Sequence, residues 1–115
     1  MNTNYIPEWK STPFHHIEYT LVRNQIQFDL LFDDVNDTDT LDLSSCSGCV
    51  IHYDKHCVVY IGDTTEYLST LVHESVHIWQ KLKKEMSEEK PSKEFEAYSI
   101  EYIFKDLMQM YKDSE

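Results

Sequence analysis

The chain has 115 residues, which is enough for one hydrophobic core and too few for a second sizeable domain. Its 21 acidic residues outnumber 10 basic residues, and the resulting formal net charge of -11 repels phosphate backbones and anionic lipid headgroups. We therefore expect no nucleic-acid partner and no membrane partner. The expected organisation is a single domain over residues 1–115, in which residues 1–13 form a flexible arm.

The sequence carries no signal for export or membrane insertion. Residues 1–10 lack a basic segment followed by an apolar run, and no apolar run approaches the roughly 18 residues of a membrane span. Three cysteines form an odd set in a chain without an export signal, which argues against a disulfide framework. We expect a cytoplasmic protein with reduced thiols, and a solvated loop at the acidic stretch 33–42.

The first half of the chain predicts four β-strands. Apolar residues alternate with polar ones in the first two segments, as in half-buried strands, and the last two are rich in β-branched and aromatic residues. Arg23-Asn24 and Asp54-Lys55 suit the turns of two hairpins. The predicted strands are residues 15–22, 25–33, 48–53 and 56–62.

The second half of the chain predicts helices. Asp63-Thr64-Thr65-Glu66 has the pattern of a capping box, and a helix of about twenty residues should follow it, to roughly Lys84. At about 100° per residue, the apolar stripe of this helix lies nearly opposite His73 and His77. The stripe consists of Tyr67, Leu68, Leu71, Val72, Ile78, Trp79 and Leu82.

The predicted helix contains an H-E-x-x-H motif, His73-Glu74-Ser75-Val76-His77. Two imidazoles four residues apart share one face of a helix, so both can bind one Zn²⁺, and the glutamate beside them can act as a general base. Histidines of the core would lie within the apolar stripe, whereas these two project from the other side. The pattern therefore favours a metal site.

A zinc hydrolase needs a third protein ligand, which leaves the fourth position for water. Ser92 is a good N-cap for a second helix, from Lys93 to about Lys112, whose first turn contains Glu94 and Glu96. These carboxylates point about 200° apart, so only one is expected to reach the ion. The apolar stripe of this helix is centred closer to Glu96, so the periodicity alone turns Glu96 inward.

The motif followed by Glu94-x-x-Ala97 at the start of a second helix resembles the gluzincin branch of the zincin metallopeptidases. It is also similar to small phage and prophage zincin-like proteins, in which H-E-x-x-H precedes E-x-x-A-Y. The resemblance covers roughly residues 58–104 and implies His73, His77 and Glu94 as zinc ligands and Glu74 as general base. Tyr98 departs from the pattern, because it stands where an acidic residue usually orients a ligating histidine.

The resemblance implies the rest of the expected function. One catalytic Zn²⁺ would activate water for attack on a peptide or amide carbonyl of a peptide or protein substrate, with Glu74 transferring the proton. An edge strand beside the active helix would pair with the substrate, and residues 58–62 are the candidate. The fold expected is α+β, with a small, mostly antiparallel sheet followed by an active-site helix and a C-terminal helix.

Three alternatives remain open at this point. Cys46, Cys49 and Cys57, with His52 or His56, have the donors for a structural Cys₃His zinc site, although no second C-x-x-C strengthens the signal. The chain can also be a binding module on a zincin scaffold. In the third alternative, zinc only clamps the two helices of a small protein.

Overall fold

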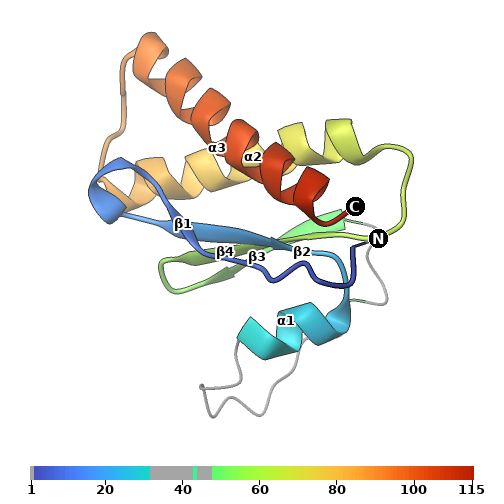
Figure 1. The fold of residues 1–115 in the computed structure, drawn as a ribbon. Coiled ribbons are helices and arrows are strands. Elements are labelled where there is room, and N and C mark those ends of the chain that lie inside the picture. The colour runs from blue at the N-terminus through green and yellow to red at the C-terminus, as the bar shows by residue number, and fades with distance from the viewer. Residues whose placement is uncertain (1, 32–42, 44–47) are drawn as a thin grey trace.

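The computed structural model describes residues 2–31, 43 and 48–115. It has the predicted α+β fold, in which two long helices cover one face of a four-stranded sheet and a short helix lies against the other face (Figure 1). In chain order the elements are β1 (Lys10–Ser11), the 3-10 helix η1 (Pro13–His15), β2 (Glu18–Val22), α1 (Gln25–Leu31), β3 (Gly48–Tyr53), β4 (His56–Ile61), α2 (Tyr67–Glu85) and α3 (Lys93–Asp113).

The sheet is mixed, with the strand order β1-β2-β4-β3. β1 pairs with β2 and β3 pairs with β4 in the antiparallel direction, whereas β2 and β4 are parallel. The predicted hairpin between β3 and β4 is confirmed, and Asp54 in its turn has the left-handed φ of 53° that tight hairpin turns require. The strand predicted at residues 15–22 is confirmed over Glu18–Val22, as β2, whereas His15 belongs to the 3-10 helix η1.

The prediction that residues 58–62 form an edge strand is wrong. Residues 58–61 belong to β4, which is hydrogen-bonded to β2 on one side and to β3 on the other. The edge beside α2 is β3, because α2 lies over β3 and β4 while α3 lies over β2. The chain order of the strands differs from their order in the sheet, because β4 lies between β2 and β3 although it follows β3 in sequence.

The prediction of a strand at residues 25–33 is also wrong, because residues 25–31 form α1. The Asn24 side chain accepts a hydrogen bond from the Gln27 amide at 2.9 Å, and the Gln27 side chain accepts one from the Arg23 amide at 2.7 Å. The Asn24 side chain thus caps the first turn of a helix, and the Gln27 side chain ties that turn back to Arg23. Of the alternating apolar residues that the structure describes, Phe28 is buried, while Ile26 and Leu30 are exposed. Residues 32 and 33 lie outside the described residues.

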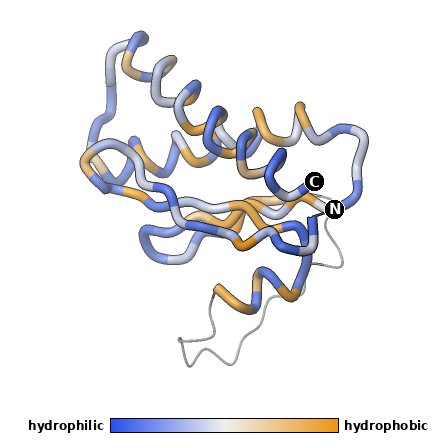
Figure 2. Tube along the Cα trace, in the orientation of Figure 1, coloured by the Kyte–Doolittle hydropathy of each residue, from blue (hydrophilic) through white to orange (hydrophobic). Residues whose placement is uncertain are grey.

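Both faces of the sheet contribute to the core. Tyr19, Leu21 and Val59 point toward α2 and α3, and their neighbours Leu71, Ile78 and Leu107 are fully buried there. On the other face Val22 and Val58 pack with Phe28 of α1 and with Leu43. Apolar segments run through the sheet, and apolar and polar positions alternate along the helices (Figure 2). Among the described residues, no helix has the length and apolar character needed to cross a membrane.

The two long helices begin differently from each other. Ser92 caps α3 as predicted, and its hydroxyl accepts a hydrogen bond from the Phe95 amide at 3.1 Å. The capping box predicted at residues 63–66 is wrong, because α2 begins only at Tyr67 and its N-cap Glu66 makes no side-chain cap bond. The helices run antiparallel, and the rings of Tyr67 and Tyr111 stack with centroids 4.2 Å apart.

The N-terminal arm and the end of α3 lie side by side (Figure 1). The Asn2 amide donates to the Ser114 carbonyl at 2.8 Å, and the Tyr5 hydroxyl donates to the Leu21 carbonyl at 2.6 Å. Arg23, which is buried, donates to the Ile61 carbonyl and to the Ser114 and Glu115 side chains. The arm predicted over residues 1–13 is thus attached to the domain at both Asn2 and Tyr5.

Candidate metal centre

His73 and His77 converge on the side of α2 that faces away from its buried stripe. Their Nε2 atoms are 3.1 Å apart. Two nitrogens bound to one tetrahedral zinc at about 2.0–2.1 Å are separated by about 3.3 Å, so the pair already has the spacing of two ligands. Both histidines lie outside the buried residues of α2, as predicted, with His73 exposed and His77 half-buried. The predicted stripe is wrong at Leu68 and Val72, which are exposed.

Gln80 orients the second histidine of the pair. The Nδ1 atom of His77 lies 3.0 Å from Oε1 of Gln80. If Nδ1 carries the proton and donates it to this oxygen, Nε2 keeps its lone pair and points it toward His73. A hydrogen bond at the nitrogen that does not bind metal fixes the tautomer of a ligating histidine. The donor arrangement therefore fits a metal on the Nε2 side.

Glu74 is placed next to the edge of the sheet. Its side chain has an exposed fraction of only 5 %, and Thr70, one turn earlier on the same flank of α2, lies against Gly48 at the start of β3. Burial raises the pKa of Glu74, and the nearby imidazoles of His73 and His77 oppose that shift. A carboxylate with a raised pKa is a better proton acceptor than an exposed one, which suits the predicted role of general base.

His52 and Cys57, which the sequence suggested only as donors of a structural zinc site, pair with each other across β3 and β4. The Nδ1 atom of His52 lies 3.3 Å from Sγ of Cys57, and burial lowers the pKa of His52, with further lowering by the charges of Lys81 and His77. Burial raises the pKa of Cys57 to about 12, so this thiol stays protonated at neutral pH. The predicted hairpin turn at residues 54 and 55 already implied this cross-strand pairing of His52 with Cys57.

The third predicted ligand does not lie with the histidine pair. Glu94 is exposed in the first turn of α3, and the Glu96 side chain accepts a hydrogen bond from Nε1 of Trp79 at 3.0 Å. Trp79 comes two residues after His77 and so leaves α2 about 200° further around the helix. Within residues 2–31, 43 and 48–115, no three His, Cys, Asp or Glu side chains gather closely enough to hold a metal ion.

The inward orientation of Glu96 that the periodicity of α3 predicts is observed, because its carboxylate accepts the hydrogen bond from Trp79. The apolar stripe of α3 turns Glu96 toward α2, but toward the flank opposite the histidines. Tyr98, the departure from the family pattern, is exposed on α3. The structure therefore brings together His73, Glu74 and His77, and it leaves Glu94 and Tyr98 apart from them.

The cysteines do not form the alternative zinc site among the described residues. Cys49 packs with Val22 and Phe28 on the α1 face of the sheet, whereas Cys57 belongs to the core cluster under α2. Side chains on opposite faces of a sheet cannot bind one ion. His56 instead lies 3.1 Å from a carboxylate oxygen of Glu18. Cys46 lies outside the described residues.

Comparison with protein families, with curated proteins and with solved structures finds no match for this chain. Its class is therefore defined by its own fold and site. It is a small α+β protein in which the helices α2 and α3 cover one face of a mixed sheet. Its candidate site consists of two converging histidines and a buried glutamate on α2.

Proposed function

We propose that the chain is a zinc-dependent hydrolase of the cytoplasm that cleaves peptide or amide bonds. The observation that supports this most is the 3.1 Å separation of the His73 and His77 Nε2 atoms beside the buried carboxylate of Glu74. An exposed polar face would not require imidazoles at ligand spacing or a desolvated acid next to them. The resemblance to gluzincins in H-E-x-x-H and E-x-x-A supports the same proposal.

His73 and His77 would hold the zinc through Nε2, and Glu94 remains the third ligand that the resemblance implies. Bound zinc supplies a Lewis acid that polarises a carbonyl and makes water more acidic. Glu74 accepts a proton from the attacking water and passes it to the leaving amine, a role favoured by its burial. Gln80 keeps the His77 ring in one orientation.

β3 offers a surface for the substrate. It is the edge strand next to α2, so its outer backbone groups can pair with an extended peptide. Gly48 at its start lies so close to α2 that a Cβ there would be 2.6 Å from the Thr70 methyl group. A peptide paired with β3 would therefore run along the flank of α2 that carries Thr70 and Glu74.

The second candidate function is a binding protein on a zincin-like scaffold, without hydrolysis. It is favoured by the position of Glu94, which the structure does not bring to the histidine pair. A clamp role for zinc between the helices has less support. α2 and α3 are already joined by the Trp79–Glu96 hydrogen bond and the Tyr67–Tyr111 stack.

The test combines metal content with cleavage of a mixed peptide library. The protein purified without chelator should hold one equivalent of zinc, which His77→Ala should lose. Glu74→Gln should keep the zinc and lose activity by about 10²-fold or more, the usual contribution of a general base. Glu88→Gln, at an exposed glutamate beyond α2, is the matched control. Glu94→Ala and Glu96→Ala identify the third ligand.

The outcomes of this test discriminate between the candidate functions. A protein that holds no zinc and gains no thermal stability from added Zn²⁺ contradicts the hydrolase and the zinc clamp. Zinc binding without cleavage of any peptide refutes the hydrolase and is the outcome expected of the binding protein or of a zinc clamp. Cleavage that persists in Glu74→Gln refutes Glu74 as the base.

A further inference from the structure

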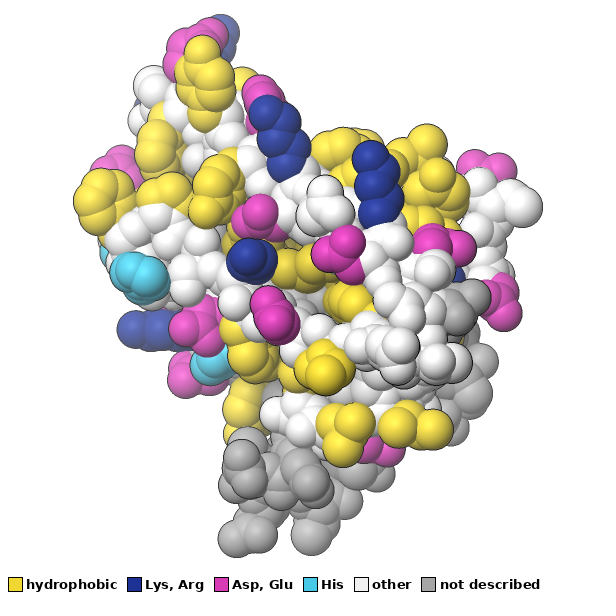
Figure 3. Space-filling view, viewed as in Figure 1, with side chains coloured by type: hydrophobic (Ala, Val, Ile, Leu, Met, Phe, Trp, Pro, Cys, Tyr) yellow, Lys and Arg dark blue, Asp and Glu magenta, His cyan; other side chains and the backbone are white. Residues whose placement is uncertain are grey.

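An aromatic patch lies on the first half of α3 and the adjoining loop between β1 and β2. Its exposed fractions are 85 % for Phe14, 67 % for Tyr98, 46 % for Tyr102 and 41 % for Phe95. Hydrophobic side chains are visible on the surface along this part of the molecule (Figure 3). We call these four residues the aromatic patch.

A groove is part of the same surface. It has a volume of about 180 Å³, and its lining includes Pro13 of the loop and Phe95, Tyr98, Ser99 and Tyr102 of α3. A cavity of about 150 Å³ lined by apolar side chains holds a benzene molecule, so this groove has room for one aromatic ring. None of the residues that line it is charged.

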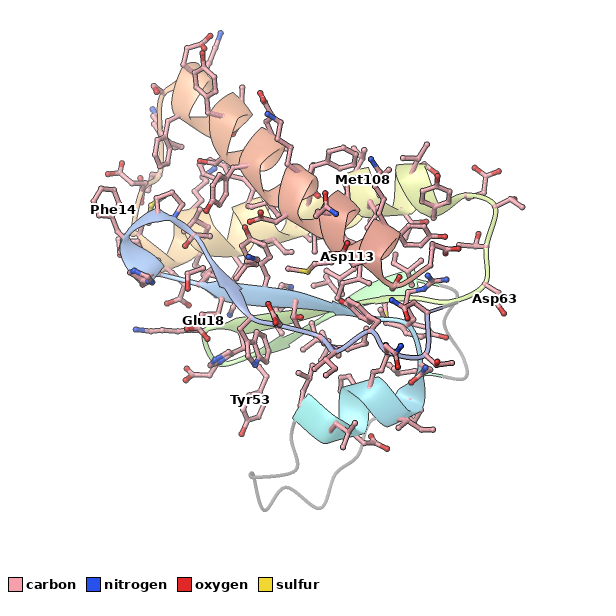
Figure 4. The ribbon with its side chains drawn as sticks, in the orientation of Figure 1. Phe14, Glu18, Tyr53, Asp63, Met108 and Asp113 are labelled. Carbon is pink, nitrogen blue, oxygen red and sulfur yellow. The ribbon has the colours of Figure 1, made fainter. Side chains whose placement is uncertain are left out.

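Phe14, next to Pro13 of the groove, protrudes into solvent because its backbone has a left-handed conformation. Phe14 and His15 have φ values of 66° and 58°, a left-handed conformation that is unfavourable for a bulky residue. Buried Thr12 holds the loop, since its carbonyl accepts from the His15 amide at 2.9 Å and its amide donates to the Ile17 carbonyl at 2.9 Å. Figure 4 shows Phe14 pointing away from the molecule. The ring is thus presented to solvent by a fixed turn.

A ring and a groove of matching size on one surface make that surface self-complementary. We propose that two copies of the chain associate through the aromatic patch, with Phe14 of each copy in the groove of the other. Such an exchange is isologous and closes at a dimer. This interface lies beyond the proposed hydrolase site, because Phe95 packs on Trp79, on the flank of α2 opposite the histidines.

The area and the charge of the patch agree with a second copy as the occupant. From their exposed fractions, the four aromatic side chains expose on the order of 500 Å² per copy, so two copies would bury about 1,000 Å², the lower bound for a specific interface. Of the charged residues on α3 near the patch, Lys105 and Glu101 neutralise each other at 3.0 Å, whereas Glu94 and Glu96 beside Phe95 are exposed carboxylates. The net charge of -11 opposes association only at long range, so added salt should strengthen the dimer.

The test is sedimentation equilibrium of the full chain from about 5 to about 500 μM, in about 150 mM salt with chelator. We expect a monomer–dimer equilibrium that tightens as salt is raised. Phe14→Asn, which suits a left-handed backbone, and Tyr98→Gln should each weaken the dimer at least tenfold. Ile26→Gln, at an exposed apolar residue of α1, is the matched control and should leave it unchanged. Circular dichroism verifies that each variant is folded.

A mixing experiment tests the exchange itself. Phe14→Asn lacks the ring and keeps the groove, whereas Ser99→Leu narrows the groove and keeps the ring. Each variant alone should be monomeric, and their mixture should form a heterodimer through one remaining contact. The proposal is overturned by a parent chain that stays monomeric at about 500 μM, which assigns the patch to another occupant. It is also overturned by a dimer insensitive to Phe14→Asn, or by oligomers that grow beyond two copies.

Discussion

The hydrogen bond from Trp79 to Glu96 offers a quantitative test of how α2 and α3 are joined. A double-mutant cycle of Trp79→Phe, Glu96→Ala and the combined variant isolates this bond from the packing lost with the larger ring. Phenylalanine keeps an aromatic ring against Phe95, whose centroid lies 5.8 Å from that of Trp79. The coupling energy then reports the N–H to carboxylate interaction.

The expected coupling is about 1 kcal/mol. Hydrogen bonds to charged groups contribute about 1.5–3 kcal/mol, and the exposure of Glu96 to solvent reduces that value. Unfolding entropies of about 2.1 cal/mol/K per residue give about 0.24 kcal/mol/K for this chain, so 1 kcal/mol corresponds to about 4 °C in Tm. Thermal denaturation in chelator measures it. A coupling below about 0.3 kcal/mol would refute the reasoning.

The same variants discriminate between the two candidate third ligands. If zinc recruits Glu96, it must first break the Trp79 bond, so Trp79→Phe should tighten zinc binding by about fivefold. If Glu94 is the ligand, the zinc Kd of Trp79→Phe should match that of the parent protein. Competition with a chromophoric chelator measures both affinities. Weaker zinc binding in Trp79→Phe would contradict both assignments.

Two further predictions concern the flank of α2 beside β3. Gly48→Ala places a Cβ 2.6 Å from the Thr70 methyl group and should lower Tm by about 4–8 °C, since overpacking costs about 1–2 kcal/mol. Adding Thr70→Ser, which lacks that methyl group, should restore the Tm. A double variant with an unrestored Tm would contradict the clash. The raised pKa of Cys57, about 12 when folded, should keep it unreactive toward iodoacetamide at pH 9 until the protein unfolds. Because the folded state holds the Cys57 proton more tightly than the unfolded state, this group stabilises the fold below pH 9, and the stabilisation is lost as pH rises toward 12. Rapid alkylation of Cys57 in the native protein would contradict the raised pKa.

The second half of the fold was predictable because its signals are local. The hairpin at residues 48–61 has β-branched runs on both sides of its turn, and the two long helices follow clear 3.6-residue patterns. Residues 25–31 were misread because apolar residues at every second position suggest a strand. Asn24 and Gln27 had the spacing of a helix cap, a signal that was present and that competes with alternation.

The candidate site was predictable only as far as one helix extends. Helical geometry alone places His73 and His77 together, because positions four residues apart share a face. The burial of Glu74 depends on how α2 packs in the fold, and the place of β3 at the edge of the sheet follows from a parallel pairing between β2 and β4 that no local pattern encodes. The position of Glu94 depends on how α3 crosses α2, which side-chain packing determines.

The parallel pairing of β2 with β4 also has a consequence for the order of folding. Its register joins residues that are far apart in sequence, such as Glu18 with His56, whereas the β3–β4 hairpin and the α2–α3 pair form between neighbours in the chain. Loop closure makes the distant contacts slower to form. We expect residues 48–111 to organise first and β2 to dock late, so that the helix bearing the histidines takes shape before the sheet beneath it is complete.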